Sequence, residues 1–291
     1  MRSLVKLSAN IFRTVSGRKT MVSWHFSPEA VLKRSLGMLD ANAARDLKKY
    51  VEGRQHVSGA FKDRAENPDL YYTLFGTLLS EALGLEEILM KTRQYVENEI
   101  CSNEPAGIHL YCASILASKL SVNRKLKAFL RKRVRKNLDD VLVRQPVYGM
   151  FVTMLACYYS GDYKGLFKIR RHLKSQPGNE TLPSTVIAAL TVLQHTFGRP
   201  TGDLIEKLRD FYDNRGGFRA VKRAPVPDLL STAVTLYACS CTHQDLKIIR
   251  PECLNFIDSL YQESGFGASM MDPEPDIEYT FYGLLALGSL A

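Results

Sequence analysis

Residues 216–240 read GGFRAVKRAPVPDLLSTAVTLYACS, and this stretch decides the fold because two further segments repeat its order of features. A glycine-rich turn with a phenylalanine comes first, a loop follows, and a Pro-Asp pair then opens a long apolar run. Residues 58–80 and 264–291 have the same order, and in each copy a threonine stands four residues after the aspartate. A pattern that recurs along a chain indicates one structural unit built several times.

Each Pro-Asp pair predicts the start of a helix. Proline loses nothing in the first turn, where its missing N–H would be unpaired anyway, and the aspartate side chain accepts one of the free N–H groups. We therefore interpret Asp69, Asp228 and Asp276 first as helix caps and only second as catalytic acids. The runs that follow, such as residues 72–80 and 280–291, contain no Lys, Arg, Asp or Glu. Uncharged runs of this kind are typical of helices buried on nearly every side.

Three fainter copies lie between the clear ones. Pro105, Pro146 and Pro183 each precede an apolar stretch, so that six prolines open six such stretches at intervals of 37 to 48 residues. Repeats of this length are typical of stacked helix pairs. Charged amphipathic segments alternate with the apolar ones and predict helices with one face in water. These segments are residues 28–50, 84–100, 122–139, 162–174, 202–212 and 244–261.

Six buried helices and six exposed ones predict an all-α fold, an (α/α)6 barrel. The last apolar run continues to residue 291, and a row of repeats that ends on such a face must cover it, for which the first repeat is available. We expect one barrel domain over residues 24–291, preceded by a basic extension over residues 1–23. Small residues such as Gly76 and Gly283 are expected to let neighbouring inner helices approach closely.

The positive charge of the chain is concentrated on predicted outer helices. The formal net charge is +9, and basic runs occupy residues 131–136 and 168–171. A solvated face is the simpler interpretation; the alternative is an anionic partner such as a membrane surface, a phosphate ligand or an acidic subunit. We expect no nucleic acid partner, because no known reader motif is present and no aromatic residues are interleaved within the basic runs.

The cysteines and the start of the chain bear on the compartment. Six cysteines without a Cys-x-x-Cys pair indicate reduced core residues, and no segment has the length of a transmembrane helix. The first acidic residue is Glu29, and the basic start before it resembles an organellar import sequence or a surface-binding helix. The alternative is that Met21 is the true first residue. We expect a cytoplasmic protein, with organellar import through residues 1–23 as the alternative.

The repeated turn, loop and Asp-capped helix resemble the toroid of protein prenyltransferase beta subunits and of squalene and other triterpene cyclases. The resemblance to this prenyltransferase and squalene oxidase repeat is strongest at residues 216–237 and 265–287. In the prenyltransferases an Asp, a Cys two residues later and a His in the last repeat hold zinc. The matching positions here are Asp228, Leu230 and Tyr279, and one carboxylate does not hold zinc. We therefore predict no metal site and no cofactor.

The resemblance also implies sites for a diphosphate and for an acid. The prenyltransferases place an Arg and a Lys between the Gly-Gly-Phe turn and the Asp, and the cationic residues of that loop here are Arg219, Lys222 and Arg223. The loop is one residue longer than in those enzymes, so a solvated turn is the alternative to a diphosphate clamp. The cyclases use an Asp-x-Asp-Asp motif, of which Asp276 and Glu278 are a degraded form; with Asp228 they are weak catalytic candidates.

Two hypotheses of function follow, and aromatic side chains separate them. An isoprenoid ligand would occupy a cavity lined by aromatic residues of the inner helices, for which the candidates are His109, Tyr71, Tyr72, Tyr111, Tyr148, Tyr279 and Tyr282. The alternative is a non-catalytic toroid that serves as a scaffold or protein-interaction module, in which these rings pack in a filled core. The resemblance further implies an alpha-type helical subunit as a partner.

Overall fold

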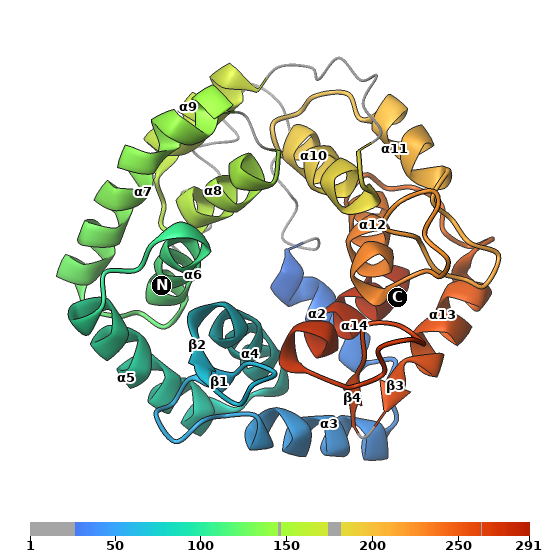
Figure 1. Ribbon diagram of the computed structural model, residues 1–291, viewed down its shortest axis with the longest axis horizontal. Coiled ribbons are helices and arrows are strands. Elements are labelled where there is room, and N and C mark those ends of the chain that lie inside the picture. Colours follow the sequence, from blue (N-terminus) through green and yellow to red (C-terminus); the bar gives the residue numbers. More distant parts are fainter. Residues whose placement is uncertain (1–26, 145–146, 174–181, 263) are drawn as a thin grey trace.

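A computed structural model describes residues 27–144, 147–173, 182–262 and 264–291, and it shows two concentric rings of helices (Figure 1). The inner ring consists of α4 (Leu70–Leu83), α6 (Gly107–Lys119), α8 (Val147–Tyr159), α10 (Ser184–Thr196), α12 (Leu229–Cys241) and α14 (Ile277–Leu290). The outer ring consists of α3 (Ala41–Gly53), α5 (Glu86–Ser102), α7 (Arg124–Arg144), α9 (Tyr163–His172), α11 (Gly202–Arg209) and α13 (Arg250–Ser259).

The inner ring closes on itself. Each inner helix packs against the next, and α14 packs against α4, so the apolar end of the chain is covered by the first repeat. The predicted all-α barrel of helix pairs is confirmed. The expected basic extension, residues 1–23, lies outside the described residues, as does Pro146.

One helix was assigned to the wrong place by its sequence pattern. Residues 28–50 were expected to form a single outer helix, but they form α2 (Pro28–Leu36) and α3, which is capped by the side chain of Asp40. Helix α2 packs against α14 and α4 and buries Val31 and Leu32. Its apolar face needs inner helices to cover it, while the more polar α3 stays outside.

The repeated aspartates and threonines connect each turn to its inner helix. Asp69, Asp228 and Asp276 accept hydrogen bonds from backbone N–H groups three residues ahead, at 2.7 to 2.9 Å, so the predicted caps are confirmed. The hydroxyl of Thr232 accepts from the backbone N–H of Phe218 at 2.8 Å and donates to the Asp228 carbonyl. Thr73 and Thr280 accept the equivalent N–H in their own repeats. The recurring pattern therefore holds each turn on a helix start.

The phenylalanine of the turn packs on a glycine of the same repeat. A Cβ atom at Gly76 would lie 2.2 Å from the Phe61 ring, and one at Gly283 would lie 2.5 Å from the Phe266 ring. These two glycines make room for their own turns, which corrects the expectation that they bring inner helices together. The glycine of the turn itself has a positive φ, +95° at Gly216, a conformation that side chains disfavour.

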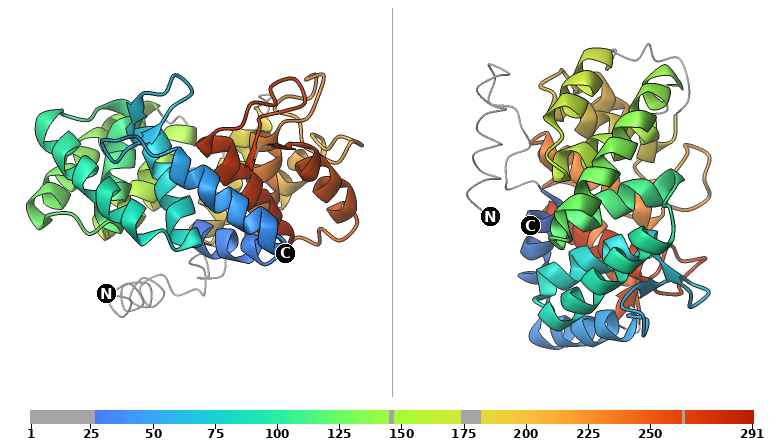
Figure 2. Two further views of the ribbon diagram at one scale, coloured as in Figure 1. Left: turned by 90° about the horizontal axis from the view of Figure 1, so that it is seen from below. Right: turned by 90° about the vertical axis from the view of Figure 1, so that its left-hand side faces the viewer.

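The connecting loops of the clear repeats gather on one face of the ring. Two short antiparallel strand pairs lie there, β1 (Phe61–Lys62) with β2 (Pro68–Asp69) and β3 (Tyr261–Gln262) with β4 (Gly265–Phe266). Figure 2 shows these loops projecting from the face on which α4, α12 and α14 begin, whereas the chain ends on the opposite face. We call the face on which α4, α12 and α14 begin the loop face.

The core holds most of the cysteines. All six are free, and only Cys101 is exposed. In the described part of the chain, no helix is both long and apolar enough to cross a bilayer.

Candidate functional site

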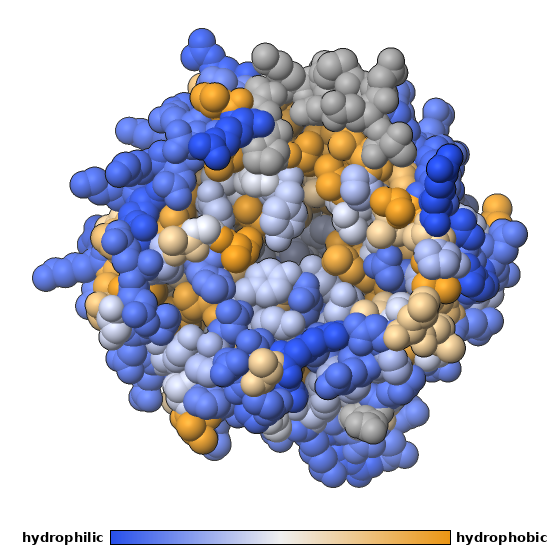
Figure 3. Space-filling view, in the orientation of Figure 1, coloured by the Kyte–Doolittle hydropathy of each residue, from blue (hydrophilic) through white to orange (hydrophobic). Residues whose placement is uncertain are grey.

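The six inner helices enclose a cavity of about 320 Å³. Its wall is almost entirely apolar, and Ser27 and Pro28 at the start of α2 also contribute to it. The space-filling view from the loop face shows the hollow at the centre of the ring (Figure 3). Aromatic residues of the wall are Tyr71, Phe75, Tyr111, Tyr148, Phe151, Tyr158, Tyr159, Tyr237, Phe281 and Tyr282. The barrel is thus hollow along its axis.

The structure places four of the six tyrosines considered from the sequence in this wall: Tyr71, Tyr111, Tyr148 and Tyr282. Tyr72 and Tyr279 lie outside it. Tyr158, Tyr159 and Tyr237 also line the cavity, although the sequence did not single them out. A signal was available for Tyr159, because it stands 11 residues after Tyr148, which is close to three helical turns and puts both on one face.

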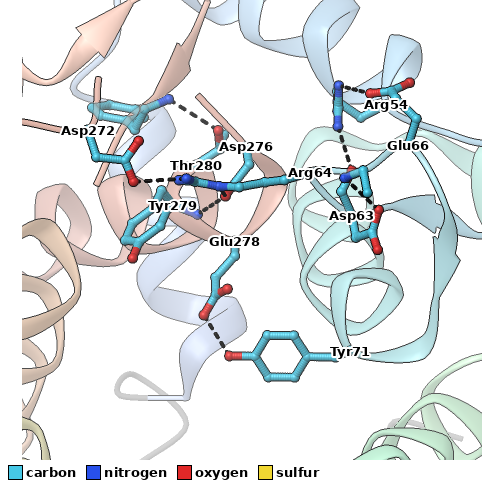
Figure 4. A network of polar contacts seen from close by, with 12 residues as sticks. Arg54, Asp63, Arg64, Glu66, Tyr71, Asp272, Asp276, Glu278, Tyr279 and Thr280 are labelled. Atoms are coloured by element: carbon cyan, nitrogen blue, oxygen red, sulfur yellow. Dashed lines mark hydrogen bonds and ion pairs between the residues drawn. The ribbon is translucent and has the colours of Figure 1, made fainter. Parts of the chain in front are cut away.

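Glu278 belongs to the first turn of α14, near the loop face (Figure 4). The hydroxyl of Tyr71 donates a hydrogen bond to Glu278 Oε1 at 2.6 Å, and Tyr282 is hydrogen-bonded to the same hydroxyl. Burial raises the pKa of the Glu278 carboxyl above its ordinary value, and the negative charge of Asp276 adds to this shift. Among the described residues, Glu278 has no ion pair, so it is a polar group available beside an apolar cavity.

Asp276 is committed to structure. Its side chain is only 1% exposed. Besides capping α14, Asp276 accepts a hydrogen bond from Arg64 Nε at 2.7 Å. The same guanidinium binds Asp272 at 2.8 Å and lies over the Tyr279 ring at 5.4 Å (Figure 4). Arg64 was not singled out from the sequence, since it lies 212 residues from Asp276. Both carboxylate oxygens of Asp276 are therefore engaged within the protein, one by the Tyr279 N–H and the other by Arg64.

His109 also has a partner outside the cavity. Its Nε2 lies 3.0 Å from Asp69 Oδ2, and its side chain is about half exposed. Neither residue contributes to the cavity wall. The contact connects the start of α6 to the cap of α4, so His109 is positioned as a link between adjacent repeats.

Two of the three cations of the 219–228 loop are paired with carboxylates. Arg219 Nε lies 2.7 Å from Asp213, and Lys222 Nζ lies 2.8 Å from Asp210. Hydrogen bonds from Arg215, with those of Arg219, hold the pKa of Asp213 well below its usual range. Arg223 is exposed and forms no ion pair with a described residue. None of the three cations belongs to the cavity wall.

Asp228, at the end of the same loop, caps helix α12. Its Oδ1 accepts from the Ser231 N–H at 2.8 Å, and burial raises the pKa of its carboxyl. The two other positions matched to zinc ligands are Leu230, which lines the cavity, and Tyr279, which does not. Among the described residues, no group of three or more His, Cys, Asp or Glu side chains could hold a metal ion.

A buried ionic cluster lies at the opposite ends of the inner helices. Lys119, the last residue of α6, contacts Glu29 at 2.6 Å and Glu81 at 2.7 Å. The hydroxyl of Tyr159, the last residue of α8, donates to Glu29 at 2.8 Å. Burial raises the pKa of Glu81. At Glu29 burial also acts to raise the pKa, but the charge of Lys119 together with hydrogen bonds from Lys119 and Tyr159 lowers it overall. This cluster joins α2 to three inner helices and was not found from the sequence.

The shifted pKa of Glu278 predicts a pH dependence of stability. Because its pKa is higher in the folded protein than the ordinary 4.5, the folded state binds the proton more tightly than the unfolded chain does. The stability associated with this proton is fully present below pH 4.5 and is lost as the pH rises through the folded-state pKa. The free energy of unfolding of the wild type, minus that of Glu278→Gln, should therefore fall as the pH rises from 4 to 8. Urea unfolding of both proteins measures this difference, and a flat or rising difference would contradict it.

Comparison with known proteins identifies a family. The model of the prenyltransferase alpha-alpha toroid domain matches residues 1–131 and 180–290. Comparisons with curated proteins and with solved structures return no match. The match spans most of the chain, and the closed ring of helix pairs is the architecture that its description names. The chain therefore belongs to the prenyltransferase alpha-alpha toroid domain family.

Proposed function

We propose that this toroid binds an isoprenoid chain in its central cavity without a catalytic zinc ion. The observation that carries the proposal is the cavity itself, about 320 Å³ of apolar and aromatic space enclosed by all six inner helices. Ligand pockets span roughly 300–1,000 Å³ and are lined mainly by apolar side chains with a few polar groups. A toroid that acted only as a scaffold would gain stability by filling this space, because buried voids are costly.

The expected affinity follows from the area that a ligand would bury. Each buried CH₂ group contributes about 0.8 kcal/mol, so a chain of roughly fifteen carbons gains about 12 kcal/mol before costs. Loss of translational and rotational freedom costs roughly 4 kcal/mol or more. The balance is no more favourable than about −8 kcal/mol, which corresponds to micromolar or weaker binding of a largely enclosed chain.

The polar groups near the loop face are suited to hold the polar end of an isoprenoid ligand rather than a catalytic metal ion. Glu278, Tyr71 and Tyr282 form a hydrogen-bonded group beside the apolar wall and supply both donors and acceptors to a ligand head. A proton transfer in this cavity would use Glu278, whose pKa is raised by burial. The Asp276 carboxylate contributes to this shift, but the positive charge of Arg64, which binds Asp276, acts in the opposite direction.

The proposed diphosphate clamp requires an exchange of partners. Arg219 and Lys222 would have to leave Asp213 and Asp210 to bind phosphate oxygens, whereas Arg223 could bind them directly. The Lys222–Asp210 pair is exposed, and charge-assisted bonds to a diphosphate are stronger than such a pair. Asp213 is buried, and Arg215 would still bind it if Arg219 left. The proposal therefore covers prenyl diphosphates as well as uncharged isoprenoids.

A cavity-filling substitution tests the proposal. Val234 lines the cavity on α12, and Val234→Phe would add a ring to the space that the ligand occupies. We expect at least a tenfold weaker binding of a fluorescent farnesyl probe in an equilibrium titration. Val57 is 98% exposed, so Val57→Phe is the matched control and should bind as the wild type does.

The scaffold hypothesis gives a different titration. Its supporting observation is that two of the three expected clamp cations are already neutralised by carboxylates. A scaffold, with or without an alpha-type helical subunit, would show no saturable probe binding in any of the three proteins. Saturable binding that Val234→Phe leaves unchanged would place the ligand outside the cavity and would contradict the proposal.

A further inference from the structure

We infer that the outer wall formed by α7 and α9 docks on the surface of an anionic membrane. The two helices pack against each other on the outside of the ring (Figure 1). Their outward residues form what we call the basic face: Lys125, Phe129, Lys132 and Lys136 of α7, with Phe167 and Arg171 of α9. The inference rests on this face and is independent of the proposed cavity ligand.

Helical spacing places the α7 residues of the basic face in one row. Positions 125, 129, 132 and 136 are separated by four, three and four residues, which keeps side chains on the same side of a helix. All four are exposed. The opposite side of α7 is buried against the ring, with Leu130, Val134, Leu138 and Leu142 facing inward. The row therefore lies on the side of α7 that does not pack against the ring.

The charges of the basic face are not neutralised by ion pairs within the described part of the chain. Three other cations of these helices are paired: Arg133 with Glu104, Arg135 with Asp162, and Lys168 with Asp139. The four cations of the basic face form no ion pair with any described residue. Charge complementarity therefore calls for an anionic partner.

Exposed rings decide the kind of partner. The basic sequence runs themselves contain no aromatic residue, but the folded helices add Phe129, 41% exposed, and Phe167, 56% exposed. Arg133 stacks over the Phe129 ring, with 5.7 Å between the guanidinium carbon and the ring centre. Cations around exposed apolar rings are typical of surfaces that enter the lipid headgroup region. Single-stranded nucleic acid prefers a groove, whereas this face lies on the convex outside of a ring.

A vesicle-binding experiment with the full chain tests the inference. The probes are phosphatidylcholine vesicles with and without 30% phosphatidylserine, and the readout is co-sedimentation at two salt concentrations. We expect binding only to the anionic vesicles, weakening as salt rises. Each basic residue near such a surface contributes roughly fivefold, so Lys132→Glu with Lys136→Glu should lower the partition coefficient at least tenfold.

A matched double variant separates the basic face from net charge. Lys48 and Lys49 of α3 are exposed on another part of the outer ring and form no ion pair with described residues. Lys48→Glu with Lys49→Glu changes the net charge by the same amount as the α7 double variant. Both variants retain the basic residues 1–23, so these residues do not account for a difference between them. The α3 variant should lower vesicle binding less than threefold. Phe129→Ser with Phe167→Ser should also weaken binding while leaving every charge in place.

Three results would overturn the inference. One is an equal loss of binding in the α3 and α7 double variants. Another is equal binding of the wild type to neutral and anionic vesicles. The third is binding of a 20-nucleotide RNA in place of vesicles, which would assign the basic face to nucleic acid. Circular dichroism and thermal unfolding of each variant show whether a loss of binding reflects a loss of fold.

Discussion

Lys119→Met is expected to destabilise the protein by about 3 kcal/mol, because it leaves two partly buried carboxyl groups, 21% and 28% exposed, without their cation. Lys119 lies between Glu29 and Glu81, and only 8% of its side chain is exposed. Methionine has a similar length, so the loss measures charge and hydrogen bonding more than packing. The free energy of unfolding from urea titration at pH 7 gives the value.

Two further variants complete the Lys119 test. Lys132→Met, on the exposed row of α7, removes the same charge from the surface and should change stability by no more than about 0.5 kcal/mol. Adding Glu29→Gln and Glu81→Gln to Lys119→Met should restore much of the lost stability, since neutral amides are cheaper to bury than carboxylates. Equal losses in the Lys119 and Lys132 variants would show that the cluster does not stabilise the fold.

Phe61→Ala is expected to cost about 3–5 kcal/mol, the usual range for removing a fully buried phenylalanine. The Phe61 ring is completely buried and lies on Gly76 of α4, which has no side chain of its own to fill the space that the ring leaves. The loss should appear as a lower midpoint of urea unfolding. The same substitution at Phe167, which is 56% exposed, is the matched control and should have little effect. A Phe61→Ala protein as stable as this control would disprove the structural role of the turn.

The start signals of the inner helices could be predicted from the sequence because their physics is local. An aspartate cap reaches an N–H only three residues away, and Asp69, Asp228 and Asp276 all do so. Ring closure could also be predicted, since the apolar end of the chain required a cover. The position of α2 could not, because its polarity alone does not say whether α14 or water covers its apolar side.

The candidate site could be predicted only in part, because contacts between residues far apart in the sequence determine much of it. Inner-helix tyrosines could be expected to face the axis, and Tyr111, Tyr148 and Tyr282 do line the cavity. Contacts between residues far apart in the sequence determine which acidic side chains of the site are paired. Asp276 is bound by Arg64 from the first clear repeat, and Lys119 binds Glu29 across 90 residues. A sequence pattern does not specify such pairings, so it could not show which acidic groups remain available.

Mass spectrometry of lipids extracted from the purified full chain tests the central claim most directly. We expect an isoprenoid in near-stoichiometric amount with the wild type and with Val57→Phe, and a strong reduction with Val234→Phe, whose new ring occupies the cavity. Thermal unfolding should show that all three proteins are folded. An isoprenoid retained in full by folded Val234→Phe, or no isoprenoid with any of the proteins after expression with added prenyl alcohol, would contradict the claim.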